Sequence, residues 1–241
     1  MGILDLPAPL YLAVDHWLAS ALPPAGRFVL WGVVAGALSM IVYHLLAPRG
    51  KIEASKRRLA DARRRLWEEE EFARALPLIG TQLGAAFKRA GLALPASLLA
   101  LLPVMTVAIW LDTAYGHTLD VGNNPPGAVV RPDGFDARVI AVPQGAPRLE
   151  VRPRGIASEP LVQHEMTAAV TRVEKRRWWN ALIGNPAGYL PEDGPVESVV
   201  LDLPPREYLS FGPRFVRSWP MLFFAAVTLA SLLLHRALKR R

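Results

Sequence analysis

The sequence contains no cysteine and only five histidines, which are scattered over its 241 residues. The absence of cysteine excludes disulfides, thiol nucleophiles and cysteine-ligated zinc or iron–sulfur sites. No two histidines lie three or four residues apart, so a helical pair of metal ligands is also excluded. Phosphate-binding glycine loops, dinucleotide-binding loops and Gly-x-Ser-x-Gly elbows are missing as well. We therefore expect no metal, no cofactor and no enzymatic activity.

The apolar residues are instead concentrated in three blocks, 28–47, 90–111 and 218–234. These blocks contain 20, 22 and 17 residues without a charge, against the roughly 20 helical residues that cross a membrane core about 30 Å thick. A buried helix of a globular core is the alternative, although such helices usually keep a polar stripe. The sequence predicts a mainly α membrane protein with three transmembrane helices, at 27–47, 90–111 and 218–234.

Basic residues are distributed unevenly between the segments that flank these blocks. Residues 1–27 and 112–217 each have a net charge of −1, whereas 48–89 and 235–241 have +5 and +4. Because cytoplasmic flanks carry the excess of Lys and Arg, both basic segments are predicted to be cytoplasmic and both others exterior. We expect an integral protein of a bacterial inner membrane, with membrane lipids as partners. The basic excess is a topology signal, so we expect no specific DNA binding.

Two features agree with this orientation. Trp31, Trp110 and Trp219 all fall near the predicted exterior face, where an aromatic belt is expected. Residues 1–26 are predicted to form an exterior interfacial tail, because their apolar residues have the spacing of a helix lying on the membrane surface. These apolar residues are Ile3, Leu6, Leu10, Val14, Trp17 and Leu18.

The segment 48–89 is predicted to form a cytoplasmic coiled-coil and amphipathic arm. Residues 51–71 are rich in strong helix formers, and Ile52, Leu59, Leu66 and Ala73 lie seven residues apart. A coiled-coil seam and a solvated charged helix both fit this pattern. Pro77 is expected to end the charged helix and to start a second one, which returns to the membrane or lies in its interface. The second helix would carry an apolar stripe of Phe72, Leu76, Ile79, Leu83 and Phe87.

Few polar groups lie inside the predicted spans. Tyr43, His44 and Ser97 are placed where they could share one inner-leaflet pocket with Lys88 and Arg89. Anchoring in headgroups and bonding to backbone carbonyls are the alternatives for these side chains. Pro95 and Pro103 are expected to interrupt the second span, either as a simple kink or with local access of water. The small residues Gly32, Gly36 and Ser39 share one face of the first span and predict close packing on another helix.

Residues 112–217 are rich in Pro and Gly and predict a β-rich exterior domain of about 100 residues with one helix at most. Strands are expected at 137–142, 149–152 and 199–203, whereas 161–179 fits either a helix or a strand. Gly184-Asn185-Pro186 and Gly188 indicate tight turns. Trp178 and Trp179 must be buried against a sheet or the bilayer, or form a binding surface.

The order of spans and charges resembles that of a known family. His44-Leu45-Leu46-Ala47-Pro48-Arg49 leads into Lys56-Arg57-Arg58 and Arg63-Arg64-Arg65, and Phe87-Lys88-Arg89 enters a proline-containing span. In this layout residues 28–111 and 218–241 resemble the YidC/Oxa/Get superfamily. Within it, they are similar to the branch that contains the third subunit of the ER membrane protein complex and the transmembrane and coiled-coil domain protein.

Members of that superfamily insert other membrane proteins through a polar groove in the cytoplasmic half of the bilayer. The resemblance implies that Lys88 and Arg89 form the groove entrance and that residues 51–71 receive the client. It also implies client membrane proteins as partners, together with the ribosome or nascent chain. The implied groove lining is Tyr43, His44, Ser97 and Thr106.

Two further functions remain open. The chain fits a structural or scaffold subunit that assembles a membrane complex through its exterior domain and its coiled coil. Membrane-anchored hydrolysis by Asp112 or His164 is the third hypothesis, although neither residue has a recognisable catalytic companion in the sequence.

Overall fold

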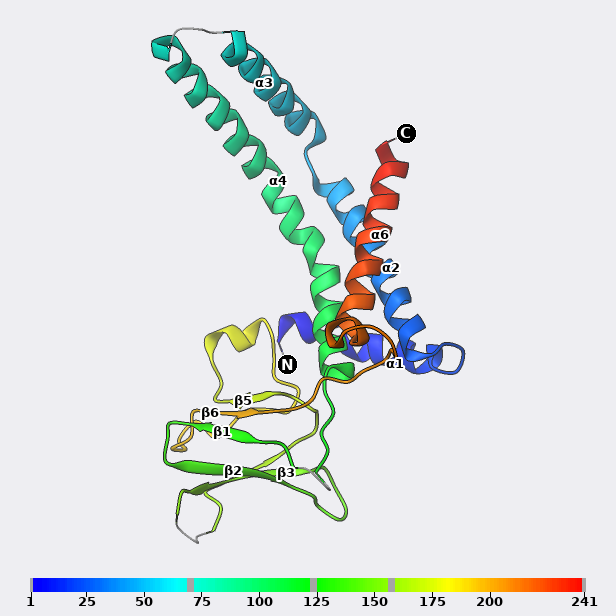
Figure 1. Ribbon diagram of the computed structural model, residues 1–241, viewed down its shortest axis with the longest axis vertical. Coiled ribbons are helices and arrows are strands. Elements are labelled where there is room, and N and C mark those ends of the chain that lie inside the picture. The colour runs from blue at the N-terminus through cyan, green and yellow to red at the C-terminus, as the bar shows by residue number, and fades with distance from the viewer. Residues whose placement is uncertain (1, 69–71, 122–124, 156–158, 240–241) are drawn as a thin grey trace. The chain divides into compact units, whose positions relative to one another are not determined.

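The computed structural model describes residues 2–68, 72–121, 125–155 and 159–239 (Figure 1). It is mainly helical, with three long apolar helices and two small antiparallel three-stranded sheets. The chain divides into two compact units. The first consists of Met1–Val33 and Met105–Val227, and the second of Val34–Val104 and Thr228–Arg241.

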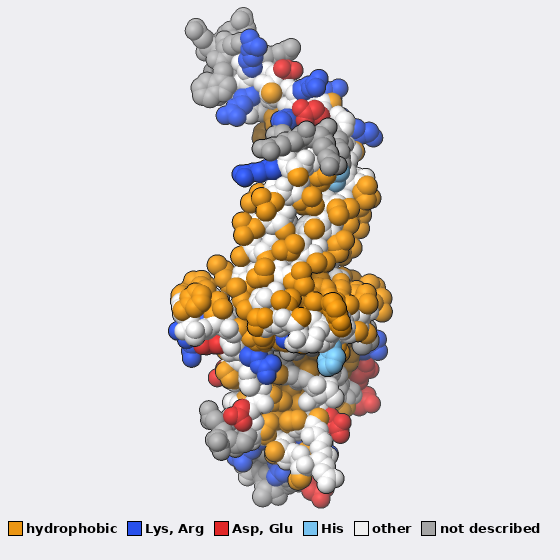
Figure 2. Space-filling view, turned by 90° about the vertical axis from the view of Figure 1, so that its right-hand side faces the viewer, with side chains coloured by type: hydrophobic (Ala, Val, Ile, Leu, Met, Phe, Trp, Pro, Cys, Tyr) orange, Lys and Arg blue, Asp and Glu red, His pale blue; other side chains and the backbone are white. Residues whose placement is uncertain are grey.

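The three long helices are α2 (Pro24–Leu46), α4 (Phe72–Tyr115) and α6 (Trp219–Lys239). Each has a stretch long and apolar enough to cross a membrane. Only 22%, 28% and 11% of the residues in their most apolar windows are buried within the protein. Figure 2 accordingly shows hydrophobic side chains over the outer surface of the helices. Exposed apolar surface of this extent is unfavourable in water and matches lipid, which indicates an integral membrane protein.

The charged helix α3 (Arg49–Glu68) is followed by one uninterrupted helix, α4. The expectation that Pro77 starts a helix was wrong, because α4 begins five residues earlier, at Phe72. Pro95 and Pro103 also lie within α4, so the amphipathic segment and the second span form a single helix. Membrane helices tolerate proline where hydroxyl groups and neighbouring helices satisfy the freed backbone groups.

Part of the predicted seam lies outside the described residues. The structure does not describe residues 69–71, nor the side chains of four residues to which the heptad and amphipathic patterns assign apolar positions. The side chains of Ile52 and Leu59 are described, and both are half-buried on α3. The four side chains that are not described are those of Leu66, Phe72, Ala73 and Leu76.

The chain begins with the short 3-10 helix η1 (Ile3–Asp5) and helix α1 (Ala8–Leu18). The apolar stripe predicted to face the membrane is largely exposed, with Leu10 65% and Trp17 73% accessible. The opposite face of α1 carries Asp15, which is only 2% exposed. A helix with its charge inside and its apolar side chains outside has the polarity expected beside lipid and the reverse of that expected in water.

The first unit contains two sheets. In one sheet β6 (Ser198–Leu201) lies between β1 (Ala128–Arg131) and β5 (Arg172–Glu174). In the other β3 (Arg148–Pro153) lies between β2 (Phe135–Ile140) and β4 (Val162–Glu165). Alternate side chains of these strands point into a common hydrophobic core. The core contains Val130, Val139, Leu149, Val151, Val162, Met166, Val173, Leu190, Val196, Val199, Leu201 and Leu203.

Strands β2, β3 and β6 overlap the three runs that the sequence predicts, whereas β1 was not predicted. The ambiguous segment 161–179 forms β4 and β5 and then enters the 3-10 helix η2 (Trp178–Ala181). These strands contain only four and three residues, too few for a two-residue period to stand out.

The four-residue helix α5 (Arg214–Arg217) precedes α6. Gly188 has a φ of 85°, a left-handed conformation that favours glycine in the turn after η2.

Candidate functional site: a basic cleft in the hairpin

The second unit contains a cleft of about 840 Å³ between α3 and α4. This volume is within the roughly 300–1,000 Å³ range of ligand-binding pockets in proteins. The lining residues of α3 recur at helical spacing on one face, and so do those of α4. They are Lys51, Ala54, Ser55, Arg58 and Asp61 from α3 and Thr81, Gly84, Ala85, Lys88 and Leu92 from α4.

The cleft is open because small residues occupy facing positions of the two helices. Ser55 is buried and its hydroxyl donates a hydrogen bond to the carbonyl oxygen of Ala85, at 3.2 Å. At Gly84 an added Cβ would find no atom within 4 Å. The helices are therefore joined through a serine hydroxyl, and the side chains that the structure describes leave the space beside this contact open.

The cleft carries more positive than negative charge. Lys51, Arg58 and Lys88 contribute three cations and Asp61 one carboxylate, which gives the lining a net charge of +2. Lys88 and Leu92 lie within the apolar stretch Ile79–Tyr115 of α4. Its 37 residues correspond to about 55 Å of helix, more than a hydrocarbon core about 30 Å thick can cover. The excess of positive charge suits the cleft to anionic groups.

The structure places five of the six predicted groove residues in the second unit and one in the first. Lys88 lines the cleft, whereas Arg89 is exposed and is not among its lining residues. Ser97 is exposed and donates to the carbonyl oxygen of Ala93 in its own helix, at 3.0 Å. The two other predicted residues of this unit, Tyr43 and His44, are half-buried near the end of α2.

Thr106 belongs to the first unit, where its hydroxyl lies 2.9 Å from that of Tyr11 in α1. Tyr11 is also packed edge-on against Trp31 of α2, with ring centroids 5.3 Å apart. The hydrogen bond between Thr106 and Tyr11 therefore helps to hold helix α1 against α4.

The predicted packing residues of α2 lie beside α6. A Cβ added at Gly32 would lie 2.5 Å from the carbonyl oxygen of Phe223, so only glycine permits this approach. Gly36 is buried, and its carbonyl oxygen accepts a hydrogen bond from Ser231 of α6 at 3.4 Å. Ser39, one turn further along, is half-buried. Small residues on α2 thus allow the two backbones to come close together, as in other membrane helix pairs.

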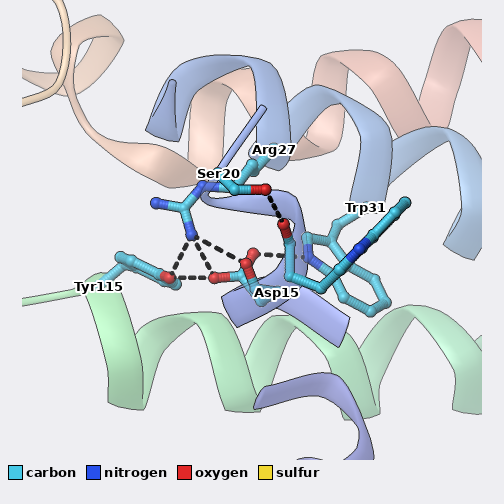
Figure 3. Close-up of polar contacts among 6 residues, drawn as sticks. Asp15, Ser20, Arg27, Trp31 and Tyr115 are labelled. Atoms are coloured by element: carbon cyan, nitrogen blue, oxygen red, sulfur yellow. Dashed lines mark hydrogen bonds and ion pairs between the residues drawn. The ribbon is translucent and has the colours of Figure 1, made fainter. Parts of the chain in front are cut away.

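A buried polar cluster lies where α1 meets α2 and α4 in the first unit (Figure 3). The carboxylate of Asp15 accepts hydrogen bonds from the Arg27 guanidinium, the Tyr115 hydroxyl and, at 3.0 Å, the Trp31 indole. Arg27 also donates to the Tyr115 oxygen at 3.0 Å, and its side chain is only 10% exposed. Charge, hydrogen bonding and burial together make this cluster a fixed structural joint.

The tryptophans predicted to form an aromatic belt belong to this interior. Trp31, Trp110 and Trp219 are 7%, 5% and 5% exposed, so they do not face lipid as expected. Trp31 and Trp110 pack on each other with centroids 5.2 Å apart. Tyr11 of α1 packs on both of these rings, with centroids 5.3 and 5.6 Å away, and helps to bury them.

Tyr208 extends the cluster into the β-rich part of the first unit. Its ring packs edge-on against Phe28, and its hydroxyl donates to the Tyr115 carbonyl oxygen at 2.9 Å. Burial raises the pKa of the Tyr208 phenol, although the nearby Arg206 acts in the opposite direction. The group is therefore held in its neutral, donating form.

From the sequence, Asp15 and Arg27 contribute only to the net charge of residues 1–27, and their pairing was not predicted. One signal was present, because Arg27 and Trp31 are separated by one helical turn and point the same way. The pairing with Asp15 required the turn at residues 19–23, which folds α1 back onto α2.

The structure also places Asp112 and His164, the two residues of the hydrolysis hypothesis. A ring nitrogen of His164 contacts the carbonyl oxygen of Ala187. Asp112 lines a separate cavity of about 440 Å³ together with His117. Within the described parts of the chain, no group of three His, Asp or Glu residues could hold a metal ion.

Comparison with protein-family models, with curated proteins and with solved structures finds no match to this chain.

Proposed function

We propose that this chain is a non-enzymatic membrane protein insertase or biogenesis factor, whose hairpin receives client segments at the cytoplasmic face of the membrane. The observation that carries the proposal is the basic cleft between α3 and α4. It is open, carries a net positive charge and is built on a helix that continues as a candidate membrane span. The layout that resembles the YidC/Oxa/Get superfamily supports the same function.

The physical argument concerns the cost of moving polar groups into lipid. A charged side chain at the bilayer centre costs about 2.5–3.5 kcal/mol on insertion scales. Lys51, Arg58 and Lys88 offer favourable Coulomb interactions to an acidic client tail or to the carbonyl dipoles of an unfolded segment. The exposed apolar stripe of α4, with Phe87 75% accessible, provides adjacent surface for the apolar part of a client.

The proposed orientation follows from the charge distribution, with residues 48–89 cytoplasmic and 112–217 exterior. Because the chain has no cysteine, single-cysteine variants can be labelled without background. Lys56→Cys and Leu161→Cys should react with an impermeant maleimide from opposite sides of the membrane. Reaction of both from the same side would refute the orientation.

The function is tested with two charge-reversal variants of equal net charge. The cleft variant replaces Lys51, Arg58 and Lys88 with Glu, and the control replaces three basic residues outside the cleft, Lys56, Arg57 and Arg89. In cells depleted of the wild-type chain and of redundant insertases, the control should restore insertion of tail-out membrane proteins and the cleft variant should not. Equal restoration by both variants would exclude the cleft as the client site.

A second variant fills the cleft without changing its charge. At Gly84 there is room for a side chain, so Gly84→Leu should be accommodated and should occupy part of the cavity. We expect photo-crosslinks from position 54 to newly made membrane proteins to decrease in this variant. Crosslinks of unchanged intensity would contradict the proposal.

One observation favours the alternative function, a scaffold subunit of a membrane complex. Val129 and Val200 are directly paired across β1 and β6 and are 61% and 39% exposed. Such an exposed cross-strand pair fits the surface of a protein partner. Purification of one fixed stoichiometric complex, lost in a Val129→Lys variant and free of nascent chains and ribosomes, would support the scaffold over the insertase.

A further inference from the structure

Two tryptophans in the described part of the chain are strongly exposed, in contrast to the buried Trp31, Trp110 and Trp219. Trp178 is 84% exposed at the start of η2, and Trp17 is 73% exposed on α1. Tryptophan carries a large apolar surface with one polar N–H group, a combination enriched at the boundary between lipid and water.

Trp178 lies on a segment that is bound directly to the amino terminus of the chain. The amide of Leu4 donates to the carbonyl oxygen of Leu182 at 2.9 Å. The Asp5 carboxylate accepts hydrogen bonds from the amides of Gly184, at 2.7 Å, and Gly2, at 2.8 Å. Two segments almost 180 residues apart in the sequence are thereby fixed to each other.

Both segments expose apolar side chains around this junction. Their exposed fractions, between 37% and 84%, are unusual for five large hydrophobic residues in two short segments. We call this surface the apolar platform, and it consists of Ile3, Leu6, Trp178, Leu182 and Ile183.

We propose that the apolar platform inserts into the interfacial layer of the bilayer leaflet on the side of the β-rich part, so that this part rests on the membrane. The occupant is lipid because the platform continues into membrane-facing surface along the chain. Leu6 leads into α1 with its exposed apolar stripe, and α1 leads into α2, where Val29 and Val33 are 41% and 43% exposed. The exposed Arg176, two residues before Trp178, adds attraction to anionic headgroups.

This anchor has a consequence for the β-rich part of the first unit. The chain connects it to α4 and α6, and the ring of Tyr208 packs on Phe28 of α2. The hydrogen bonds of Leu4 and Asp5 also join it to the amino-terminal segment, so insertion of the platform adds a direct attachment to the bilayer. This inference does not depend on the insertase function.

The test measures depth in the membrane with spin labels on the full chain. The cysteine-free sequence permits single labels through Trp178→Cys and Leu6→Cys, with Leu161→Cys as the matched control. Leu161 is 54% exposed and apolar, lies in the same unit and has no part in the platform. The protein is studied in nanodiscs of phosphatidylethanolamine and phosphatidylglycerol, without other proteins.

Collision rates with oxygen and with a nickel chelate distinguish lipid from water. Labels at 178 and 6 should collide more with oxygen and report depths of about 5–10 Å, as interfacial segments do. The label at 161 should collide more with the nickel chelate. Water-like values at 178 equal to those at 161 would overturn the proposal and would indicate a protein partner for the exposed tryptophan.

A second variant tests the pairing of the two segments. Asp5→Ala removes the acceptor of the Gly184 amide and leaves the exposed side chains unchanged. The depth reported at 178 should shift toward the value at 161, while the label at 6 stays in the membrane. An unchanged depth at 178 would refute the two-segment anchor.

Discussion

The buried joint around Asp15 gives the sharpest test of the fold. In Asp15→Asn the side chain keeps its shape but loses its charge, which leaves the Arg27 guanidinium buried without a counter-ion. The side chains of Arg27 and Asp15 are 10% and 3% exposed, so water cannot replace the lost partner. In addition, the Nε atom of Arg27 already has no hydrogen-bond partner in the structure. Removing one member of such a buried pair costs about 3–5 kcal/mol.

This loss should be visible as a lower Tm of the full chain in nanodiscs. For a protein of this size 1 kcal/mol corresponds to about 2–4 °C, so we expect a decrease of about 6–20 °C in Asp15→Asn. Tryptophan fluorescence reports the transition, because Trp31 donates to the Asp15 carboxylate and packs on Trp110. The double variant Asp15→Asn/Arg27→Gln should recover part of the loss, since no unpaired charge remains.

A surface ion pair of the same unit provides the control. Asp136 accepts a hydrogen bond from Arg154 at 2.9 Å, but these side chains are 54% and 64% exposed. Solvent screens the pair, so Asp136→Asn should cost no more than about 1 kcal/mol. A Tm decrease in Asp15→Asn no larger than in this control would refute the reasoning. A Tm decrease in the double variant larger than the sum of the decreases in Asp15→Asn and Arg27→Gln would also refute it.

Three further substitutions change the free energy of unfolding, two in opposite directions and one in a pH-dependent way. Gly32→Ala places a Cβ 2.5 Å from the Phe223 carbonyl oxygen and should destabilise the α2–α6 contact by about 1–3 kcal/mol in a denaturant titration. Gly80→Ala, in open space on α4, should instead stabilise by up to about 1 kcal/mol; equal effects would contradict the close contact. Burial raises the pKa of the Tyr208 phenol above its ordinary value of 10.0. The neutral phenol therefore contributes its full stabilisation to the folded state below pH 10.0, and this stabilisation is lost as the pH rises through the raised pKa. In Tyr208→Phe the free energy of unfolding should no longer fall in this alkaline range. If it falls with pH as in the wild type, Tyr208 is not the group responsible.

The three long helices and the charged arm follow from local sequence. Runs of 17 to 22 uncharged residues determine where helices can be stable in lipid, because backbone groups must be satisfied within the segment. Strands β2 and β3, with six residues each, were predictable because alternating side chains reveal a sheet surface, and β6 was predictable from its β-branched residues. Within 161–179 the sequence left a helix and a strand open, and pairing with β6 makes the three-residue β5 a strand.

The candidate cleft could be predicted only in part. Lys88 was identified as a groove residue from its position at the entrance to a span. Lys51, Arg58 and Asp61 fall within the segment 51–71 that the resemblance implies as the client-receiving arm, but they were not identified individually, because their position opposite α4 depends on the register between the two helices. That register is set by the Ser55 contact with Ala85, thirty residues away, which no local periodicity contains.

The sequence by itself determined which segments can cross a membrane and which flanks are basic, because both properties depend on the composition of contiguous residues. Only the tertiary structure decided that Asp15 and Arg27 are partners, that three tryptophans are buried and that Trp178 is exposed. Each of these outcomes depends on residues brought together from distant segments. Their burial and charge are properties of the packed chain, and short-range sequence patterns do not contain them.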